Sequence, residues 1–420
     1  MSPVSRNTKQ RNFITNNAEV CILREPEVKM NGSECFHSHF QKAPQYRFSA
    51  PGRTELGGNH TDHQHGCALA AAVDLEVTAW VGENGTNEIF LLSEGFPACR
   101  VDLCDLAVQK AEIGTTAALI RGVAAGFAAR GEVLRGLNIY CRSLVLSGSG
   151  LSSSAAFEVM LATVFNHLFC GEKYDAVEIA KIAQAAEQDY FGKPCGLLDQ
   201  TACAAGGIVG LDFQNPQNPK IERIAFDFNF CGYALCIIDT HSDHADLTDA
   251  YAAIPAEMCA VATQFGKEVL RETDEAAFYR GLADVRAKCG DRAALRAMHF
   301  FEENRRVGRE IDALRRGDFA AFLQEVRASG HSSRELLQNI TPPQSERQQS
   351  AAFTLALCEK LLGNRGASRI HGGGFGGTVQ AFVPQETCDA FCAEIDCVLG
   401  SGSCIPLHIR PHGGTLEEVY

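Results

Sequence analysis

A short loop rich in glycine and serine constrains this chain more than any other segment of its sequence. The run Ser147-Gly-Ser-Gly-Leu-Ser-Ser-Ser-Ala-Ala follows the apolar stretch Leu144-Val-Leu and leads directly into a helical pattern. Gly148 and Gly150 allow the backbone to approach an anion closely, and the hydroxyls of residues 152–154 can donate to it. The first N–H groups of the helix add the positive end of its dipole. The order strand, loop, helix thus predicts a phosphate-binding site.

This loop differs from the commonest nucleotide-binding loops. No Gly-Lys-Ser/Thr closes it, and its glycines are not spaced as Gly-x-Gly-x-x-Gly. On composition alone, a serine-capped helix after a flexible loop is an equal alternative. A second glycine run, His371-Gly-Gly-Gly-Phe-Gly-Gly-Thr, does contain that spacing from Gly372 to Gly377. A strand pattern follows it at Val379–Val383, where a dinucleotide fold needs a helix, so we expect a tight hairpin or a close backbone contact instead.

The size of the chain indicates more than one domain. With 420 residues and 45% hydrophobic content, the chain is long for a single domain and can bury a large core. We expect a lead-in over residues 1–45, where Asn31-Gly32 interrupts any period, an N-terminal domain over 46–210 and a C-terminal domain over 211–420. Strand and helix patterns alternate in both halves, so the predicted fold class is α+β.

Several segments have a clear period. Strand patterns occur at Arg47 to Arg53, at Leu75 to Val81, at Ile208 to Phe213, at Tyr233 to Asp239 and around Val379 to Val383. Helical spacing occurs at Thr116 to Ala129, at Ser153 to Phe169 and at Asp175 to Tyr190, and long charged amphipathic helices follow from about 250 to 338. We see no internal repeat.

Charge and cysteine usage restrict the partners and the location. The formal net charge of −13 disfavours binding to nucleic acid or to anionic lipid. The chain has neither a long uncharged apolar run nor a signal-peptide pattern at its start, so we expect a soluble, cytoplasmic protein that is a monomer or a weak homodimer. The 18 cysteines are scattered through apolar segments without any CxxC pair and are expected to be reduced core thiols.

Three separated segments together resemble the signature motifs of the GHMP kinase superfamily in order and spacing. They are Pro51-Gly-Arg-Thr-Glu-Leu-Gly-Gly-Asn-His-Thr-Asp, the Gly148 to Ala156 loop and Gly372-Gly-Gly-Phe-Gly-Gly. The His60-Thr-Asp62 element is similar to the galactokinase branch of that superfamily rather than to mevalonate or homoserine kinases. This resemblance implies a two-domain fold with the active site in the interdomain cleft. It also implies transfer of a phosphoryl group from ATP to the anomeric hydroxyl of galactose.

The resemblance assigns roles to individual positions. It implies that Asp199, in Gly196-Leu-Leu-Asp-Gln, accepts or polarises the proton of the sugar hydroxyl, and that Arg53 lies over the transferred phosphoryl group. A nearby guanidinium would also hold Asp199 ionised. The implied sugar-binding residues are Asn59, His60, Asp62, Gly196 and Tyr251. The implied ATP-binding residues are Gly148, Ser149, Gly150, Leu151, Ser152, Ser153 and Ser154.

A magnesium ion is expected to accompany ATP. Glu187 aligns with the Mg²⁺-binding glutamate of the family and lies at the edge of an apolar helical stripe that includes Ala180 and Ala183. The alternative for a glutamate at such an edge is a salt bridge to lysine or arginine. The Ser154 hydroxyl is the expected second protein ligand, and Ser153 is the alternative. Histidine and aspartate clusters near residues 60–65 and 241–246 lack the spacing of a zinc site.

The first motif departs from the family where the sugar is expected. Galactokinases usually read Asn-Leu-Ile-Gly-Glu-His-Thr-Asp-Tyr where this chain has Glu55-Leu-Gly-Gly-Asn-His-Thr-Asp-His. A neutral amide at Asn59 can donate to a 6-hydroxyl or to a 6-carboxylate, so galacturonate is an alternative substrate, although no arginine is evident for its carboxylate. Asp62-His63-Gln64 is also similar to galacturonokinase. A catalytically weak sugar sensor is a further alternative, disfavoured because the loop is intact. The tryptophan that some galactokinases place near Thr115 to stack on adenine is absent.

Overall fold

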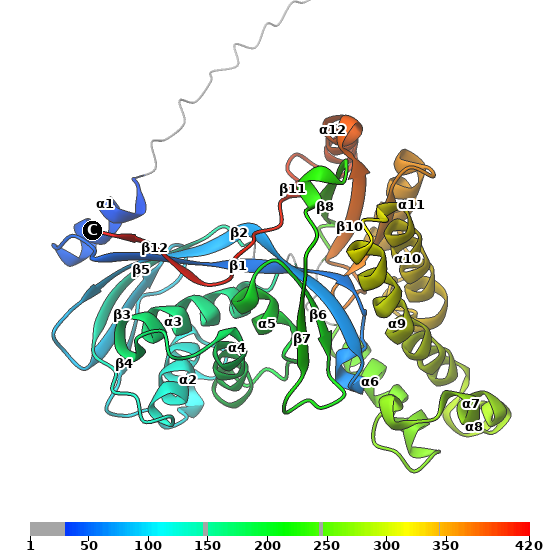
Figure 1. The fold of residues 1–420 in the computed structure, drawn as a ribbon, viewed down its shortest axis with the longest axis horizontal. Helices are drawn as coiled ribbons and strands as arrows, with labels where there is room; N and C mark the ends of the chain where they lie inside the picture. The colour runs from blue at the N-terminus through cyan, green and yellow to red at the C-terminus, as the bar shows by residue number, and fades with distance from the viewer. Residues whose placement is uncertain (1–29, 146–149, 243–246, 344) are drawn as a thin grey trace, which may run out of the picture.

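The computed structural model describes residues 30–145, 150–242, 247–343 and 345–420. These residues form two sheets, each packed against helices (Figure 1). The fold class α+β with two domains, expected from the sequence, is confirmed. The strand patterns expected around Arg47, Leu75, Ile208, Tyr233 and Val379 all form strands, and the three predicted N-terminal helices form as well.

The larger sheet has the strand order β12-β1-β2-β5-β3-β4, with β6 paired to β2 and β7 to β6. Its strands are β1 (Tyr46–Gly57), β2 (Cys67–Glu83), β3 (Glu88–Ser93), β4 (Cys99–Asp102), β5 (Leu137–Ser143), β6 (Ile208–Asp212), β7 (Lys220–Ile224) and β12 (Thr415–Val419). Only β3 and β5 pair in parallel. The predicted domain boundary near residue 210 falls inside β6. Two strands that follow it in the sequence, β7 and β12, also belong to the larger sheet.

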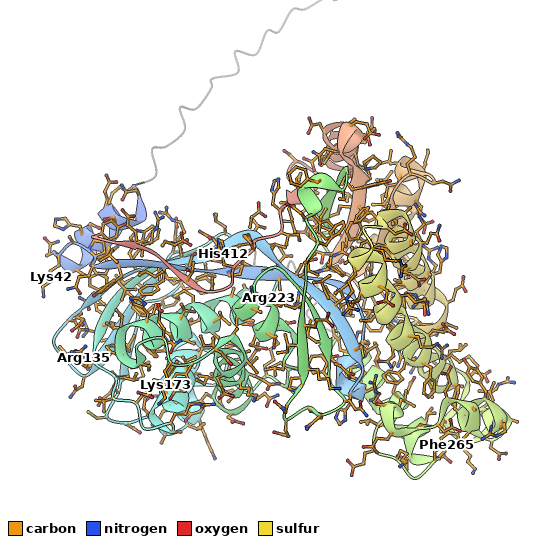
Figure 2. All side chains as sticks on the ribbon, viewed as in Figure 1. Lys42, Arg135, Lys173, Arg223, Phe265 and His412 are labelled. Carbon is orange, nitrogen blue, oxygen red and sulfur yellow. The ribbon has the colours of Figure 1, made fainter. Side chains whose placement is uncertain are left out.

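One face of the larger sheet is covered by four helices (Figure 1). They are α2 (Thr116–Ala128), α3 (Ser153–Cys170), α4 (Ala176–Ala185) and α5 (Leu198–Ala205). Small residues of β2 allow close packing on both faces: Ala68 and Ala70 pack with α5, whereas Leu69 and Ala71 belong to the main core. Side chains fill the space between sheet and helices (Figure 2).

The smaller sheet belongs to the C-terminal part and has the order β11-β8-β10-β9, all antiparallel. Its strands are β8 (Tyr233–Asp239), β9 (Ala367–His371), β10 (Thr378–Pro384) and β11 (Cys404–Leu407). The accompanying helices are α6 (Thr248–Thr263), α7 (Glu275–Arg280), α8 (Leu282–Cys289), α9 (Asp291–Arg315), α10 (Phe319–Ser332), α11 (Ser350–Leu362) and α12 (Cys388–Leu399). The second glycine run joins β9 to β10 as the hairpin expected from the sequence.

One sequence interpretation was wrong in the lead-in. Asn31-Gly32 does not interrupt structure but begins helix α1 (Gly32–Phe40), because the Asn31 side chain and Glu34 form a reciprocal capping box. Phe36 of this helix is buried in a small aromatic cluster with Trp80 and Tyr140. The helix thus covers the end of the larger sheet.

Among the described residues, helix α3 alone is long and apolar enough to cross a membrane by length and composition. However, 56% of its 18-residue window is buried inside the protein. That burial is typical of a core helix, and α3 carries the glycine and serine loop at its start.

Candidate active site

The first glycine and serine loop meets the second glycine run directly. Gly150 has φ +71°, and a Cβ atom there would lie 2.9 Å from Oγ1 of Thr378 and 3.0 Å from Nδ1 of His371. These two residues flank the second run at the ends of β10 and β9. Both the left-handed backbone and the lack of space require glycine at position 150. Gly148 and Ser149, expected to bind phosphate, lie outside the described residues.

The first motif supplies the third side of the same site. The Arg53 N–H of β1 donates to the Leu151 carbonyl at 3.0 Å, so strand and loop lie side by side. The Arg53 guanidinium donates through Nε to Oδ1 of Asp199 at 2.7 Å and through Nη1 to the Gly150 carbonyl. This one side chain joins β1 to segments that lie 97 and 146 positions further along the chain.

Asp199 is held as an ion. Burial alone would raise the pKa of the Asp199 carboxyl, but the Arg53 guanidinium and the Ser152 hydroxyl, which donates to Oδ2, bring it below its ordinary value. Asp199 is the second residue of the short helix α5, and Leu198, the first, packs in the core. Its side chain is 30% exposed, so an ionised carboxylate faces open space beside the loop.

A second carboxylate, that of Glu187, lies beside the first turn of α3. Oε1 of Glu187 accepts a hydrogen bond from Oγ of Ser154 at 2.8 Å and forms an ion pair with Lys193, also at 2.8 Å. Its other oxygen accepts from Nε2 of Gln200 at 2.7 Å. Glu187 thus contacts Ser154, the other expected magnesium ligand, and it also has the lysine partner of the alternative interpretation.

The position of Glu187 results from a local irregularity. Helix α4 ends at Ala185 and continues as a π-helical turn, Ala186–Phe191, which widens the helix. Such turns insert one residue and redirect the side chains that follow. Here the Glu187 side chain is only 2% exposed although it ends in a carboxyl group.

A third acidic group completes this polar region. Glu158 lies four residues after Ser154 on α3, is fully buried, and its Oε1 atom has no hydrogen-bond partner. Burial raises the pKa of Glu158 well above its ordinary value, and the Glu187 carboxylate adds to that effect. The Nε2 group of Gln200 donates to both Glu158 and Glu187.

Arg53, Asp199 and the serines at 152–154 line a pocket of about 310 Å³ between the loop and the second glycine run. Its lining consists of Arg53, Gly150, Ser152, Ser153, Ser154, Lys193, Asp199, Tyr251, His371, Gly372, Gly373, Gly374, Gly376, Gly377 and Thr378. The pocket is polar and has cationic groups at Arg53 and Lys193. It is the right kind of space for a phosphorylated ligand.

A larger apolar pocket of about 630 Å³ adjoins the first one, because both include Ser153 and Ser154. Its other walls come mainly from β5, the start of α2 and the loop before β4, and include Phe96, Thr115, Leu119, Cys141, Phe157 and Phe191. Phe96 is 56% exposed. A polar and an apolar pocket thus share the two serines at the start of α3.

Buried histidine supports the polar pocket. Nε2 of His371 accepts from the Glu55 backbone N–H at 3.2 Å, which leaves Nδ1 as the protonated nitrogen facing Oγ1 of Thr378 at 3.1 Å. Burial lowers the pKa of His371 well below its ordinary value, and the Arg53 charge lowers it further. The ring is neutral and connects β1 to the second glycine run.

The residues expected to bind sugar fall into two groups. Tyr251 lines the polar pocket and donates to the Gly374 carbonyl at 2.8 Å. His60, Asp62 and Gly196 lie next to the lining: His60 contacts the Gly373 carbonyl at 2.9 Å, and a Cβ atom on Gly196 would meet the Asp62 carboxylate at 2.4 Å. Segments 60–62 and 196 are thus in direct contact.

Asn59 has a different environment from the one expected. Its side chain is fully buried, and its Nδ2 group donates to Oε1 of Glu55 at 3.1 Å and to the Gly372 carbonyl at 2.6 Å. Its Oδ1 atom accepts from Asn339 at 2.9 Å. Both amide hydrogens are therefore used within the protein, and Asn59 is not part of the pocket lining.

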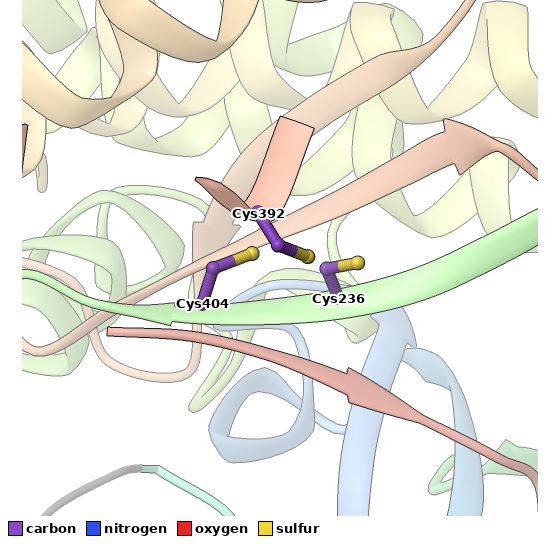
Figure 3. Close-up of side chains that lie close together, drawn as sticks. All are labelled: Cys236, Cys392 and Cys404. Carbon is purple, nitrogen blue, oxygen red and sulfur yellow. The ribbon is translucent and has the colours of Figure 1, made fainter. Parts of the chain in front are cut away.

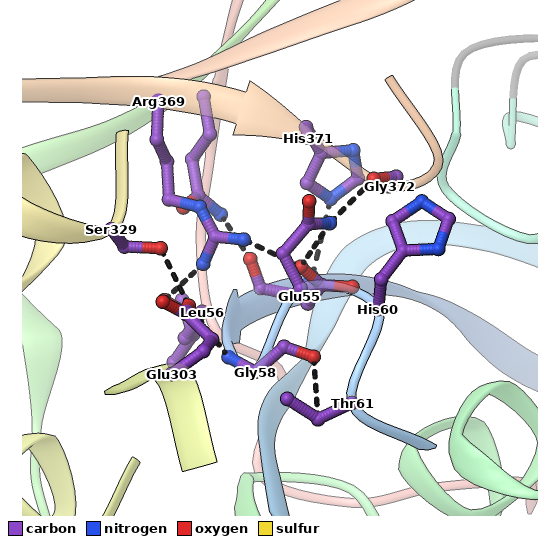
Figure 4. A network of polar contacts seen from close by, with 12 residues as sticks. Glu55, Leu56, Gly58, His60, Thr61, Glu303, Ser329, Arg369, His371 and Gly372 are labelled. Atoms are coloured by element: carbon purple, nitrogen blue, oxygen red, sulfur yellow. Dashed lines mark hydrogen bonds and ion pairs between the residues drawn. The ribbon is translucent and has the colours of Figure 1, made fainter. Parts of the chain in front are cut away.

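Glu55 is in turn fixed by a buried cation. The Arg369 guanidinium donates to Glu55 at 2.6 Å and to the Leu56 carbonyl at 2.9 Å (Figure 4). Nearby, Ser329 donates to Glu303 at 2.6 Å, and Glu303 accepts from the Gly58 N–H at 3.3 Å (Figure 4). This network packs the first motif against the C-terminal domain and fixes the side of the cleft that carries His60.

Sequence reasoning missed Lys193, Glu158 and His371. Glu158 had a usable signal, since it is an acidic residue in an otherwise apolar helix and lies one turn after Ser154. His371 directly precedes the second glycine run, but its partners come from β1, more than 300 positions earlier. Lys193 had no periodic signal, because it follows the π-helical turn in a loop.

Two family models match the chain. The model described as the GHMP kinases N terminal domain matches residues 118–207, which contain α3, the π-helical turn and Asp199. The model described as the galactokinase galactose-binding signature matches residues 34–83, which contain Arg53 and Asp62. Both matched segments thus contribute to the polar pocket, one with Arg53 and the other with Asp199.

The chain is similar to galactokinases over most of its length. It is 31% identical to a galactokinase of Streptomyces coelicolor, covering 86% of this chain and 91% of the relative. It is 32% identical to a galactokinase of Mycobacterium tuberculosis, covering 81% and 89%. A Lactococcus lactis galactokinase solved with galactose has the same fold, with a TM-score of 0.77 and 23% identity over 91% of this chain and 98% of that one. A mevalonate kinase is more distant, with a TM-score of 0.63 and 16% identity, covering 87% and 99%. The chain therefore belongs to the galactokinase family of the GHMP kinase superfamily.

Proposed function

We propose that this protein transfers the γ-phosphoryl group of ATP to the anomeric hydroxyl of galactose, giving galactose 1-phosphate and ADP. The observation that carries this proposal is the position of Asp199. An ionised carboxylate is paired with Arg53 and Ser152, faces the polar pocket and lies beside the N-terminus of α3. Family membership makes a sugar and ATP the expected substrates.

Asp199 and Arg53 are proposed to divide the chemistry. The Asp199 carboxylate accepts the proton of the sugar hydroxyl as that oxygen attacks, or polarises it in place. The Arg53 guanidinium faces the oxygens of the transferred group and offsets their negative charge. Phosphoryl transfer needs little more than this alignment and neutralisation.

The triphosphate is proposed to lie along residues 150–154. The backbone N–H groups at the start of α3 and the hydroxyls of Ser152 and Ser153 face it, and the helix dipole favours its charge. Lys193 is the second cation of the pocket, and its side chain is 56% exposed, so it is free to turn toward a phosphate.

The donor set at the end of this loop suits magnesium. Oγ of Ser154 and Oε1 of Glu187 are 2.8 Å apart, close to the ~3 Å that separates neighbouring ligands in an octahedral Mg²⁺ site. Ser154 and Glu187 would therefore hold Mg²⁺, which when bound neutralises phosphate oxygens.

The adenine base is proposed to occupy the apolar pocket. That pocket shares Ser153 and Ser154 with the phosphate site, so one ATP molecule can span both. The aromatic rings of Phe96, Phe157 and Phe191 among its walls can contact a planar base. They replace the stacking tryptophan that is absent near Thr115.

The sugar is proposed to lie at the other end of the polar pocket, beside Asp199, Tyr251 and Gly373. Asp62 and Gly196 are in contact at this end and present a carboxylate and a backbone to sugar hydroxyls. Two observations support galactose over galacturonate. Both amide hydrogens of Asn59 already donate within the protein, so they are not available to a sugar carboxylate. Among the described residues that line the pocket, Arg53 is the only arginine.

A coupled kinase assay tests this choice. We expect Mg²⁺-dependent release of ADP with galactose and a much lower kcat/KM with galacturonate or glucose at equal concentration. A larger kcat/KM on galacturonate would overturn the substrate assignment. Binding of galactose without turnover would instead identify a sugar sensor.

A further inference from the structure

Four cysteines of the C-terminal domain bring their thiols together away from the polar pocket. Cys236 lies in β8 and Cys404 in the neighbouring strand β11, whereas Cys388 and Cys392 lie one turn apart on α12. Figure 3 shows the side chains of Cys236, Cys392 and Cys404 gathered between the two strands and this helix. Three separate elements thus contribute to one cluster.

The spacing of these sulfur atoms fits a metal site. The Sγ atoms of Cys236, Cys392 and Cys404 all lie within 4.8 Å of one another. Cys388 adjoins this group, with its Sγ atom 3.8 Å from that of Cys236. In a tetrahedral zinc thiolate with Zn–S bonds of about 2.3 Å, neighbouring sulfur atoms are about 3.8 Å apart. Among the described residues, no other group of histidine, cysteine and acidic side chains meets the same criterion.

The ordinary role of a buried cysteine is to pack as a small apolar residue. Cys236, Cys388 and Cys404 do belong to a core cluster with Ile238 and Phe391, as does Cys358. Packing alone, however, does not require three thiols to converge with a fourth directly beside them. Cys358 belongs to the same core but contributes no sulfur atom to this cluster.

We propose that Cys236, Cys388, Cys392 and Cys404 bind one zinc-class divalent cation in a closed tetrahedral thiolate site. Binding replaces four S–H bonds by four metal–sulfur bonds and releases four protons to solvent. No ligand position is left open, so the role of the ion is structural. The sequence spacing gave no indication of this site, because the ligands span positions 236 to 404.

The consequence for the protein is a connection between α12 and the strands of the smaller sheet. Cys236 lies in β8, which ends at Asp239, and the next residue, Thr240, donates its N–H to the Gly377 carbonyl at 2.9 Å. Gly377 lines the polar pocket. The ion would therefore stabilise the sheet that carries the second glycine run.

The test uses the full chain expressed with zinc available and purified without chelators or a histidine tag. We expect elemental analysis to find about one zinc per chain in the wild type and in the control Cys358→Ala, and little in Cys392→Ser/Cys404→Ser. Less than about a tenth of an ion in the wild type, or retention of zinc by the double variant, would overturn the proposal.

Because the double variant can fail to fold, a second measurement uses the wild type alone. Refolding with Co²⁺ in place of zinc should give the sulfur-to-cobalt charge-transfer band and the intense visible bands of a tetrahedral thiolate site. Weak octahedral cobalt bands would contradict the site. Disulfide bonds among these four cysteines, found by mass spectrometry of the purified protein under non-reducing conditions, would also overturn it.

Discussion

Oδ1 of Asp199 accepts a hydrogen bond from Nε of Arg53 at 2.7 Å, and both side chains line the polar pocket. The pair joins β1 to the start of α5 and keeps the carboxylate ionised. Arg53 is itself almost completely buried, so its charge needs this partner. Asp199 therefore has two roles: its carboxylate neutralises the buried Arg53, and it is the proposed proton acceptor.

Asp199→Asn should lower kcat by about 10²- to 10⁴-fold while leaving the Kd for ATP almost unchanged. The amide oxygen can still accept from Arg53, so the fold is retained, whereas proton acceptance is lost. Steady-state kinetics and ATP titration by calorimetry measure the two effects. The control is Asp189→Asn, an exposed acid in the π-helical turn. Normal turnover by Asp199→Asn would remove this residue from the proposed chemistry.

Glu187→Gln should raise the Mg²⁺ concentration for half-maximal activity by about ten-fold or more, because a neutral amide binds the cation poorly. The glutamine oxygen can still accept from Gln200, and its amide N–H can donate to the Ser154 hydroxyl, which limits the effect on stability. The matched control is Glu178→Gln on α4, whose carboxylate pairs with Arg130 and Lys181 at the surface. Identical magnesium titrations of both variants would contradict a ligand role for Glu187.

Asn59 and Glu55 exchange the residue types usual in the family, and in this structure they bind each other. Asn59→Glu alone should destabilise the protein by about 2–4 kcal/mol, because two carboxylates would then face each other in a buried site. Combining it with Glu55→Asn should recover part of that loss, giving a coupling of about 1–3 kcal/mol. Urea unfolding of the four proteins of the cycle measures it. Additive effects would show that the pair does not interact.

His299 makes stability depend on pH. Burial lowers the pKa of His299 from 6.5 to about 4, and the neutral ring bridges Ser332 and the Asn59 carbonyl. Between pH 6.5 and 4, His299 binds a proton in the unfolded chain but not in the folded one, and this favours unfolding. The contribution of His299 to the free energy of unfolding is therefore complete above pH 6.5 and is lost as the pH falls toward 4. Its full size is about 3 kcal/mol.

His299→Gln should remove this share of the pH dependence. Urea unfolding at pH 7 and at pH 4.5 would show a smaller difference for the variant than for the wild type. His412→Gln is the control, because His412 is exposed (Figure 2). If both variants lose stability on acidification as the wild type does, His299 is not the group responsible.

Local patterns predicted most of the elements that build the site. The helix after Ser152, the strand containing Arg53 and the hairpin at the second glycine run all follow from periodicity and glycine content within a few residues. The predictions failed where a side chain and a neighbouring backbone cooperate: Asn31 begins a helix through a reciprocal cap with Glu34. The π-helical turn at Glu187 was also not predicted, because the sequence continues a helical period through it.

By itself, the sequence determined the order of strand, loop and helix, the three glycine-bearing motifs and the charged groups that accompany them. Backbone conformation and hydrophobic period are local properties, so they can be read from neighbouring residues. Only the tertiary structure decided that Gly150 lies against His371 and Thr378, that the Asn59 amide is used within the protein, and that Cys236, Cys392 and Cys404 converge. Each of these depends on which groups from distant segments share one buried space, and packing of the whole chain sets that choice.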